Sequence, residues 1–153
     1  MLRRISAAAL ALVLSVVQTG AVNVGIYTLV STGVTTALSA QSYTPTLNLD
    51  GATAVSLEAN FQYGSGGTSL ALWAQTSCDG GTTWRDVARF DFTTSTLVQY
   101  ANLSGLTAKA VTTYATLASA GVNDGLICNQ LRAVITSVGI YANTTVSLRA
   151  SVR

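Results

Sequence analysis

The sequence predicts an all-β fold, an antiparallel β-sandwich or jelly-roll-like domain that follows an apolar N-terminal arm. Two stretches, residues 55–63 and 146–153, alternate apolar and polar side chains, which is typical of strands that bury one face. Short strand-like runs, seven to nine in all, are separated by turns rich in Gly, Asn and Asp. No amphipathic helical pattern interrupts them after residue 50. These observations favour a sandwich of antiparallel strands.

The N-terminal segment, residues 1–34, is predicted to be separate from a sandwich domain at residues 35–153. Arg3 and Arg4 precede an apolar run at residues 5–17, a pattern typical of a secretory signal peptide. The same run could instead be an arm that packs on a neighbouring subunit, since it is too apolar to leave in water. The side chains predicted to form that interface are Leu2, Ile5, Leu10, Leu12, Val13, Leu14, Val16 and Val17.

The first strand is expected at residues 22–30, which are rich in Val, Ile, Tyr and Leu, with a break before residue 34. Residues 35–49 are rich in Thr and Ser and contain the only proline, Pro45. They predict a loop followed by an edge strand that ends at a turn over Asp50 and Gly51. The alternating strand at residues 55–63 comes next.

A β-hairpin is predicted at residues 77–84, between strands at 69–76 and 84–92, because glycine accepts the positive φ of a tight turn at little cost. Asp79 can accept hydrogen bonds from amides across this turn, and Ser77 and Thr83 can do so more weakly. The residues assigned to this structural hairpin are Ser77, Asp79, Gly80, Gly81, Thr83 and Trp84.

In the returning strand, the even positions Ala88, Phe90 and Phe92 are expected to face inward. Asp86 falls on the same inward face, next to Arg85, so a β-bulge is expected there.

The rest of the chain predicts three more strands, at residues 97–103, 126–138 and 144–153. Residues 106–121, rich in Ala and Thr, predict either a strand with a long loop or a short helix. Tyr141 is expected at the tip of a turn. In the last strand, the inward positions are Val146, Leu148, Ala150 and Val152.

The amino-acid composition limits the classes of function that this chain can have. Charged residues make up only 9% of the chain, against about 25% in ordinary domains. A surface of Thr, Ser, Asn and Gly is poorly protected against association, which indicates a protein packed against other subunits, including copies of itself. Lys109 is the only lysine, and no basic run occurs, so nucleic acid is not an expected partner.

Catalysis and metal binding have little support in the residues. The chain has no histidine, which removes histidine-dependent triads and the commonest metal ligand. Asp50, Asp79 and Asp124 lie beside glycines, where turn formation explains them. Glu58 and Asp91 fall on outward faces, and the remaining carboxylate, Asp86, cannot form an acid-base pair alone. We therefore expect no enzyme activity, no metal, no cofactor and no small-molecule substrate.

Two pairs of residues leave alternatives open. Cys78 and Cys128 could form one disulfide or remain two free thiols. Trp73 and Trp84 could form a sugar-stacking platform, although core packing near the hairpin is the simpler interpretation.

The hairpin pattern S-x-D-G-G-x-T-W resembles the Asp-box of sialidases and other β-propellers, but one copy cannot build a propeller. It equally resembles small β-sandwich virion proteins of tailed bacteriophages. That resemblance extends over residues 35–153, through the aromatic strand at 89–93, residues 102–105, and the C-terminal stretches 131–137 and 146–153. It implies a structural subunit, either a capsid decoration (cement) protein or a neck or tail component, assembled in the host cytoplasm. Its partners would be the major capsid protein or neck and tail proteins.

A different class of function remains open on the residues alone. A secreted or periplasmic β-sandwich, either an adhesion or a carbohydrate-binding module, would lose residues 1–21, bond Cys78 to Cys128 and bind sugar near Trp73 or Trp84. A fibre-associated phage protein that contacts the host surface is a third alternative.

Overall fold

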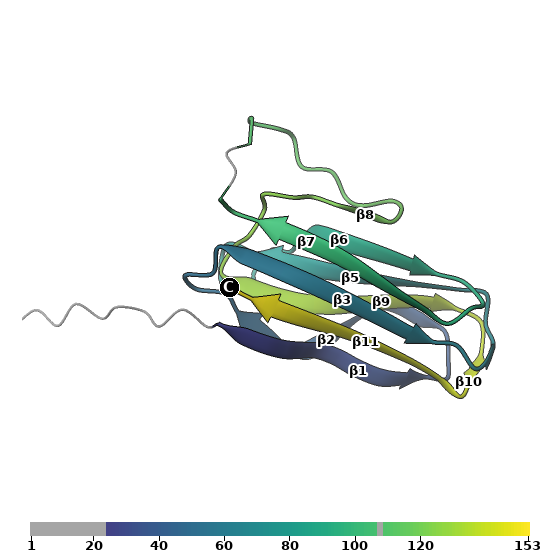
Figure 1. The fold of residues 1–153 in the computed structure, drawn as a ribbon. Helices are drawn as coiled ribbons and strands as arrows, with labels where there is room; N and C mark the ends of the chain where they lie inside the picture. The colour runs from purple at the N-terminus through teal and green to yellow at the C-terminus, as the bar shows by residue number, and fades with distance from the viewer. Residues whose placement is uncertain (1–23, 107–108) are drawn as a thin grey trace, which may run out of the picture.

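Two antiparallel β-sheets pack face to face, and the part of the chain that the structure describes contains no helix (Figure 1). The structure is a computed structural model that describes residues 24–106 and 109–153. The all-β sandwich expected from the sequence is confirmed. The predicted interface arm, from Leu2 to Val17, lies outside the described residues.

The smaller of the two large sheets, here called sheet A, has four strands in the order β1-β11-β3-β7. These strands are β1 (Gly25–Val34), β11 (Thr144–Val152), β3 (Ala54–Gln62) and β7 (Leu97–Ser104). The strand that the sequence grouped with the N-terminal arm is β1, which pairs with β11 from Gly25 to Val34. It continues through the expected break at Gly33, so the sandwich begins before the predicted boundary at residue 35.

Sheet B has five strands in the order β2-β9-β5-β6-β8. They are β2 (Leu38–Asn48), β9 (Gln130–Val138), β5 (Ser69–Ser77), β6 (Arg85–Phe92) and β8 (Gly121–Val122). A two-stranded ribbon of β4 (Ser65–Gly66) and β10 (Tyr141–Ala142) lies at one end. The predicted edge strand β2 is longer than expected, and its register against β9 shifts around Pro45, because proline cannot donate a ladder hydrogen bond.

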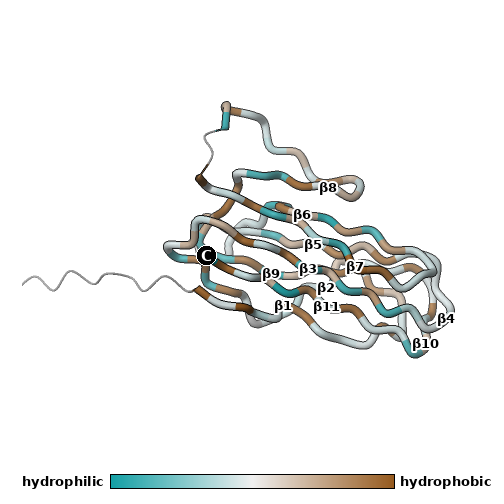
Figure 2. Tube along the Cα trace, in the orientation of Figure 1, coloured by the Kyte–Doolittle hydropathy of each residue, from teal (hydrophilic) through white to brown (hydrophobic). Residues whose placement is uncertain are grey.

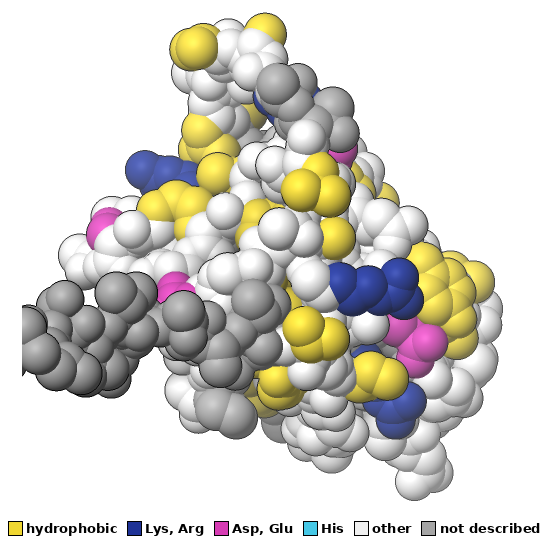
Figure 3. Space-filling model, turned by 60° about the vertical axis from the view of Figure 1, so that its left-hand side comes forward, with side chains coloured by type: hydrophobic (Ala, Val, Ile, Leu, Met, Phe, Trp, Pro, Cys, Tyr) yellow, Lys and Arg dark blue, Asp and Glu magenta, His cyan; other side chains and the backbone are white. Residues whose placement is uncertain are grey.

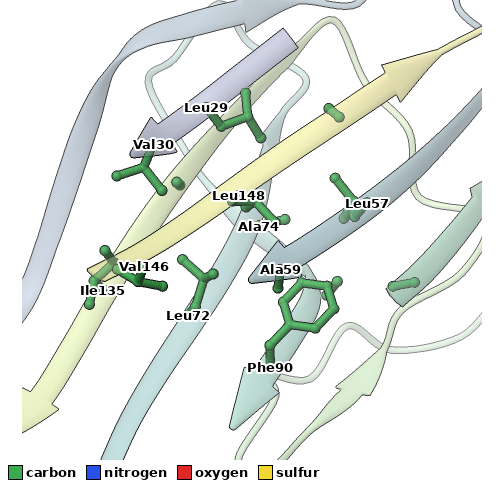
Figure 4. Packing of buried hydrophobic residues seen from close by; sticks show 14 of the residues in the cluster. Leu29, Val30, Leu57, Ala59, Leu72, Ala74, Phe90, Ile135, Val146 and Leu148 are labelled. Atoms are coloured by element: carbon green, nitrogen blue, oxygen red, sulfur yellow. The ribbon is translucent and has the colours of Figure 1, made fainter. Parts of the chain in front are cut away.

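The core lies between the two sheets and is made of the inward positions of alternating strands (Figures 2 and 4). The predicted alternation in β3 and β11 is confirmed, since every second side chain in both strands is buried. Phe61 at the end of β3 is fully buried and stacks on Phe92 of β6 with ring centroids 5.1 Å apart. The inward positions of β3 and β11 are Val55, Leu57, Ala59, Phe61, Val146, Leu148, Ala150 and Val152.

Tyr141 is not at an exposed tip, so that expectation was wrong. Its side chain is 3% exposed, and its hydroxyl donates a hydrogen bond of 2.7 Å to the carbonyl oxygen of Ser69. The ring lies against Gly67, where an added Cβ would meet it at 2.1 Å. Only glycine leaves room for this contact, and the φ of +55° at Gly67 also favours glycine.

A β-bulge in β6 is present where the sequence predicted one, but it turns Asp86 to the opposite face. Ala88 pairs with Ala74 and Asp86 pairs with Gln75, which leaves Val87 as the extra residue. Directly opposed residues share a face of the sheet. Because Gln75 is on the outer face of sheet B, Asp86 is also on the outer face, and the predicted inward position was wrong.

Candidate functional site

The hairpin between β5 and β6 is closed by the side chain of Asp79. Its Oδ1 accepts hydrogen bonds of 2.8 Å from the Thr83 amide and from Ser77 Oγ, and its Oδ2 accepts one of 2.7 Å from Thr83 Oγ1. Ser77 Oγ also accepts a bond from the Gly81 amide, and Trp84 Nε1 donates to the Gly81 carbonyl. The carboxylate is occupied by its own turn, which supports the structural interpretation of this motif rather than a ligand-binding one.

These bonds make the hairpin sensitive to acid. Hydrogen bonds from the Thr83 amide, the Thr83 hydroxyl and Ser77 lower the pKa of Asp79 from 3.8 to about 2. A lowered folded-state pKa stabilises the hairpin at pH values above about 4, and this contribution is lost as the pH falls towards 2. We expect the Asp79 carboxyl carbon to titrate in NMR spectra with a midpoint near 2. A midpoint at 3.8 would show that the hairpin bonds do not hold the ionised form.

A disulfide joins Cys78 in the hairpin to Cys128 before β9, with Cα atoms 4.8 Å apart. Of the two alternatives left open by the sequence, the structure has the bonded one. Thr76 beside it is fully buried, donates to the Gln130 carbonyl at 2.8 Å and accepts from the Cys128 amide at 3.2 Å. The hairpin is therefore fixed to the start of β9 by covalent and polar contacts.

The two tryptophans lie on the outer face of sheet B, not in the core. The Arg132 guanidinium stacks on Trp84 at 4.1 Å, and the Arg89 guanidinium stacks on Trp73 at 4.6 Å from the ring centroid. Arg132 also donates two hydrogen bonds to Gln75 Oε1, at 3.0 and 2.8 Å. Both indoles are half-buried, and a guanidinium covers one face of each ring. That face is therefore not available for stacking on a sugar.

A segment of residues 112–120, here called the strap, covers part of the same outer face. The Leu117 amide donates to Asp86 Oδ2 at 3.0 Å, and the Ala120 amide donates to Asp91 Oδ2 at 2.8 Å. The Asp86 residue is 6% exposed, and its carboxylate accepts a second bond, from Gln75 Nε2, at 2.8 Å. The one carboxylate that the sequence left unexplained therefore holds the strap on the sheet.

Replacing Asp86 with alanine is expected to lower the free energy of unfolding by about 2 kcal/mol, because the Leu117 and Gln75 donors lose their acceptor in a buried place. The strap amides should also exchange faster with deuterium. Urea unfolding with hydrogen exchange measures both effects. Asp50→Ala removes an exposed carboxylate and serves as the control, with an expected change below about 0.5 kcal/mol. Unchanged exchange at Leu117 and Ala120 in the Asp86 variant would contradict this role.

Asp124 and Glu58 are also engaged locally. Asp124 contacts Lys109 Nζ at 3.2 Å and accepts a bond from the Ser104 amide, while Glu58 lies 3.9 Å from Arg149. Among residues 24–106 and 109–153, no group of three or more Cys, Asp or Glu side chains is placed to hold a metal ion. Nor does any helix in this part of the chain have the length and apolar character to cross a membrane.

The outer face of sheet A is the candidate interaction surface. Ile26 and Tyr100 are 77% and 70% exposed and flank a shallow hollow of about 250 Å³. Small side chains from the two strands between them, Ser56 and Ser151, lie in register across its floor. Figure 3 shows that one side of the molecule is mostly uncharged, with charged side chains in a few separate places. Glu58 and Arg149, 3.9 Å apart, also line this hollow, so their opposite charges balance. A face that combines exposed apolar side chains with balanced charges suits contact with another protein.

Sequence reasoning did not identify this surface, although a signal was present. Strand β7 has Val98 and Tyr100 at outward positions, while Ala101 and Leu103 are buried on its other face. Apolar residues on both faces of a strand indicate that its outer face is also a contact surface.

Comparison of the chain with protein-family models, with curated proteins and with solved structures finds no match in any of the three.

Proposed function

We propose that this chain is a non-enzymatic structural subunit of a tailed-phage virion, of the capsid decoration or cement class. The observation that supports it most is the pair of strongly exposed apolar side chains, Ile26 and Tyr100, on the otherwise mainly polar outer face of sheet A. Burying a large apolar side chain contributes about 1.5–3 kcal/mol. A few such contacts repeated over many copies in a shell would add substantially to its resistance to pressure.

Two further features agree with this role. The hairpin carries the S-x-D-G-G-x-T-W pattern that resembles phage virion sandwiches, and Asp79 and the disulfide make it rigid. The few charged side chains are largely engaged within the chain, as in the Arg89–Asp91 pair at 2.8 Å. A rigid module with a neutral surface can lie flat on a neighbour without bringing unpaired charges into the contact.

Copy number in purified particles tests this proposal. Particles from cells that encode the chain would be purified by density gradient, and the chain counted against the major capsid protein by quantitative mass spectrometry. We expect comparable copy numbers. A handful of copies would instead support a neck, tail or fibre-associated subunit, and complete absence from particles would contradict every virion role. Ile26→Ser with Tyr100→Ser should reduce incorporation, whereas Val111→Ser, at another exposed site, should not.

A secreted or periplasmic module is the second candidate, and the Cys78–Cys128 disulfide favours it, because disulfides persist in oxidising compartments. Intact mass of the native protein, measured with and without reductant, separates the two. A chain that lacks residues 1–21 and gains two hydrogen masses on reduction would support export. The full mass from Met1 to Arg153 would support assembly in the cytoplasm.

A further inference from the structure

The two sheets of the sandwich differ by one strand, and the difference lies on one side. Sheet A ends at β7, whereas sheet B continues past β6 to β8. β6 and β7 face each other across the sandwich, and Gln99 Nε2 of β7 donates to the Asp91 carbonyl of β6 at 3.3 Å. The position next to β7 in sheet A, opposite β8, therefore has no strand among the described residues.

A groove of about 340 Å³ occupies this position. Gln99, Tyr100 and Ala101 of β7 line one wall, and Gly121 and Val122 of β8 line the other. Its charged member, Arg89, is already paired with Asp91. An occupant that enters this groove would therefore meet an apolar and electrically neutral lining.

The free edge of β7 can accept a strand. The Ser104 amide points away from β3 and donates to Asp124, whereas the next amide, that of Gly105, donates to Thr53 on the β3 side. Backbone groups of alternate residues point to opposite edges of a strand, so those of Tyr100 and Asn102 also point away from β3. β7 contains no proline and no charged residue, which are the usual features that prevent an edge from pairing.

The space beside β7 can hold a single extended segment but not a second copy of the whole sandwich. If β7 of another copy paired with β7, its β6 would fall where β8 already lies. A lone strand has no second sheet attached and avoids that overlap. The groove therefore suits a peptide-like segment that adds to the sheet edge.

The chain itself supplies a segment with the required chemistry. Residues 10–17 number eight, as do those of β7, and carry no charge. In an extended conformation, one side would present Leu10, Leu12, Leu14 and Val16. These apolar side chains match a neutral groove lined by Tyr100 and Val122.

For an antiparallel strand on β7, geometry favours the arm of a neighbour over the chain's own. β1 and β7 are the two edge strands of sheet A. The first residue of β1 lies at the same end of the sheet as the last residue of β7. The last residue of an antiparallel strand on β7 would lie about 30 Å from Val24. This distance combines the length of the strand with four spacings between strands. Residues 18–23 reach about 25 Å at most. We propose that residues 10–17 of a second copy add to β7 as a fifth, antiparallel strand of sheet A, a pairing that does not depend on a virion role.

Photo-crosslinking of the full chain tests this pairing. A benzophenone amino acid in place of Leu12, in a mixture of ¹⁴N- and ¹⁵N-labelled chains, should give mixed-label crosslinks to β7 or β8. Same-label crosslinks alone would show that the arm folds back on its own chain and would overturn the proposal. Crosslinks confined to the outer face of sheet A, or a native protein that lacks residues 1–21, would also overturn it.

Edge variants provide a second readout, the loss of multimers in analytical ultracentrifugation. Val98→Lys places a charge beside the new strand, and Asn102→Pro removes an amide that β3 does not use. Both should convert the multimer to monomer, while the matched controls Val98→Thr and Asn102→Ala should retain it. If the Asn102→Pro variant does not fold, the Val98→Lys variant alone tests the pairing. A multimer that survives Val98→Lys with the fold intact would contradict the proposal.

Discussion

Phe61→Ala is expected to lower the free energy of unfolding by about 4 kcal/mol, within the range measured for buried phenylalanine. Phe61 is fully buried between the sheets. Its ring lies 5.1 Å from that of Phe92 and 6.4 Å from that of Tyr141. Removal of the ring would leave a cavity whose walls belong to three strands, β3, β6 and β10, that cannot collapse together without breaking their ladders.

Urea unfolding followed by tryptophan fluorescence measures this effect, and two variants calibrate it. Phe61→Leu retains most of the volume and should cost less than half as much. Tyr100→Ala removes an aromatic ring that is 70% exposed on the adjacent strand, and should change the stability by less than about 1 kcal/mol. If the Phe61 and Tyr100 variants were equally destabilised, the core would not be centred on the aromatic cluster.

Loss of the disulfide should have an effect of similar size. Cys78 and Cys128 are 50 residues apart, and closing a loop of that length restricts the unfolded chain by about 4 kcal/mol. The double variant Cys78→Ser with Cys128→Ser should therefore unfold at a clearly lower urea concentration than the oxidised protein. Wild-type protein in reductant should approach the variant.

The same experiment distinguishes the cross-link from the local packing. If the serine variant lost stability but reduced wild type did not, the serines themselves would be responsible. If neither lost stability, the polar contacts of Thr76 with Gln130 and Cys128 would already hold the hairpin to β9. The expected result is a parallel loss in both.

The strands that were predicted well are those with one buried and one open face. β3 and β11 were predicted correctly because Leu57 and Leu148 each lie between polar neighbours that face outward. The hairpin was also predictable, since Asp79 and the two glycines after it form their bonds within a few residues. Local chemistry was sufficient in these places.

The errors occurred where distant segments decide the structure. Tyr141 is buried because Gly67, far away in the sequence, leaves a space for its ring. Asp86 faces outward because of the bulge at Val87, and there the strap supplies the amide of Leu117 as its partner. Neither strand nor helix propensity predicts an irregular strap. The pairing of Cys78 with Cys128, which the sequence left open, likewise depends on β5 lying beside β9.

The position of β11 constrains the order in which the protein can be completed during synthesis. β11 is the last strand of the described chain to leave the ribosome, yet it lies between β1 and β3. Until it emerges, β1 has no neighbour in sheet A, and β3 is paired along one edge only, with β7. Until β11 is available, the nascent chain therefore exposes unpaired edges of β1 and β3, which favours binding by chaperones that shield exposed strands.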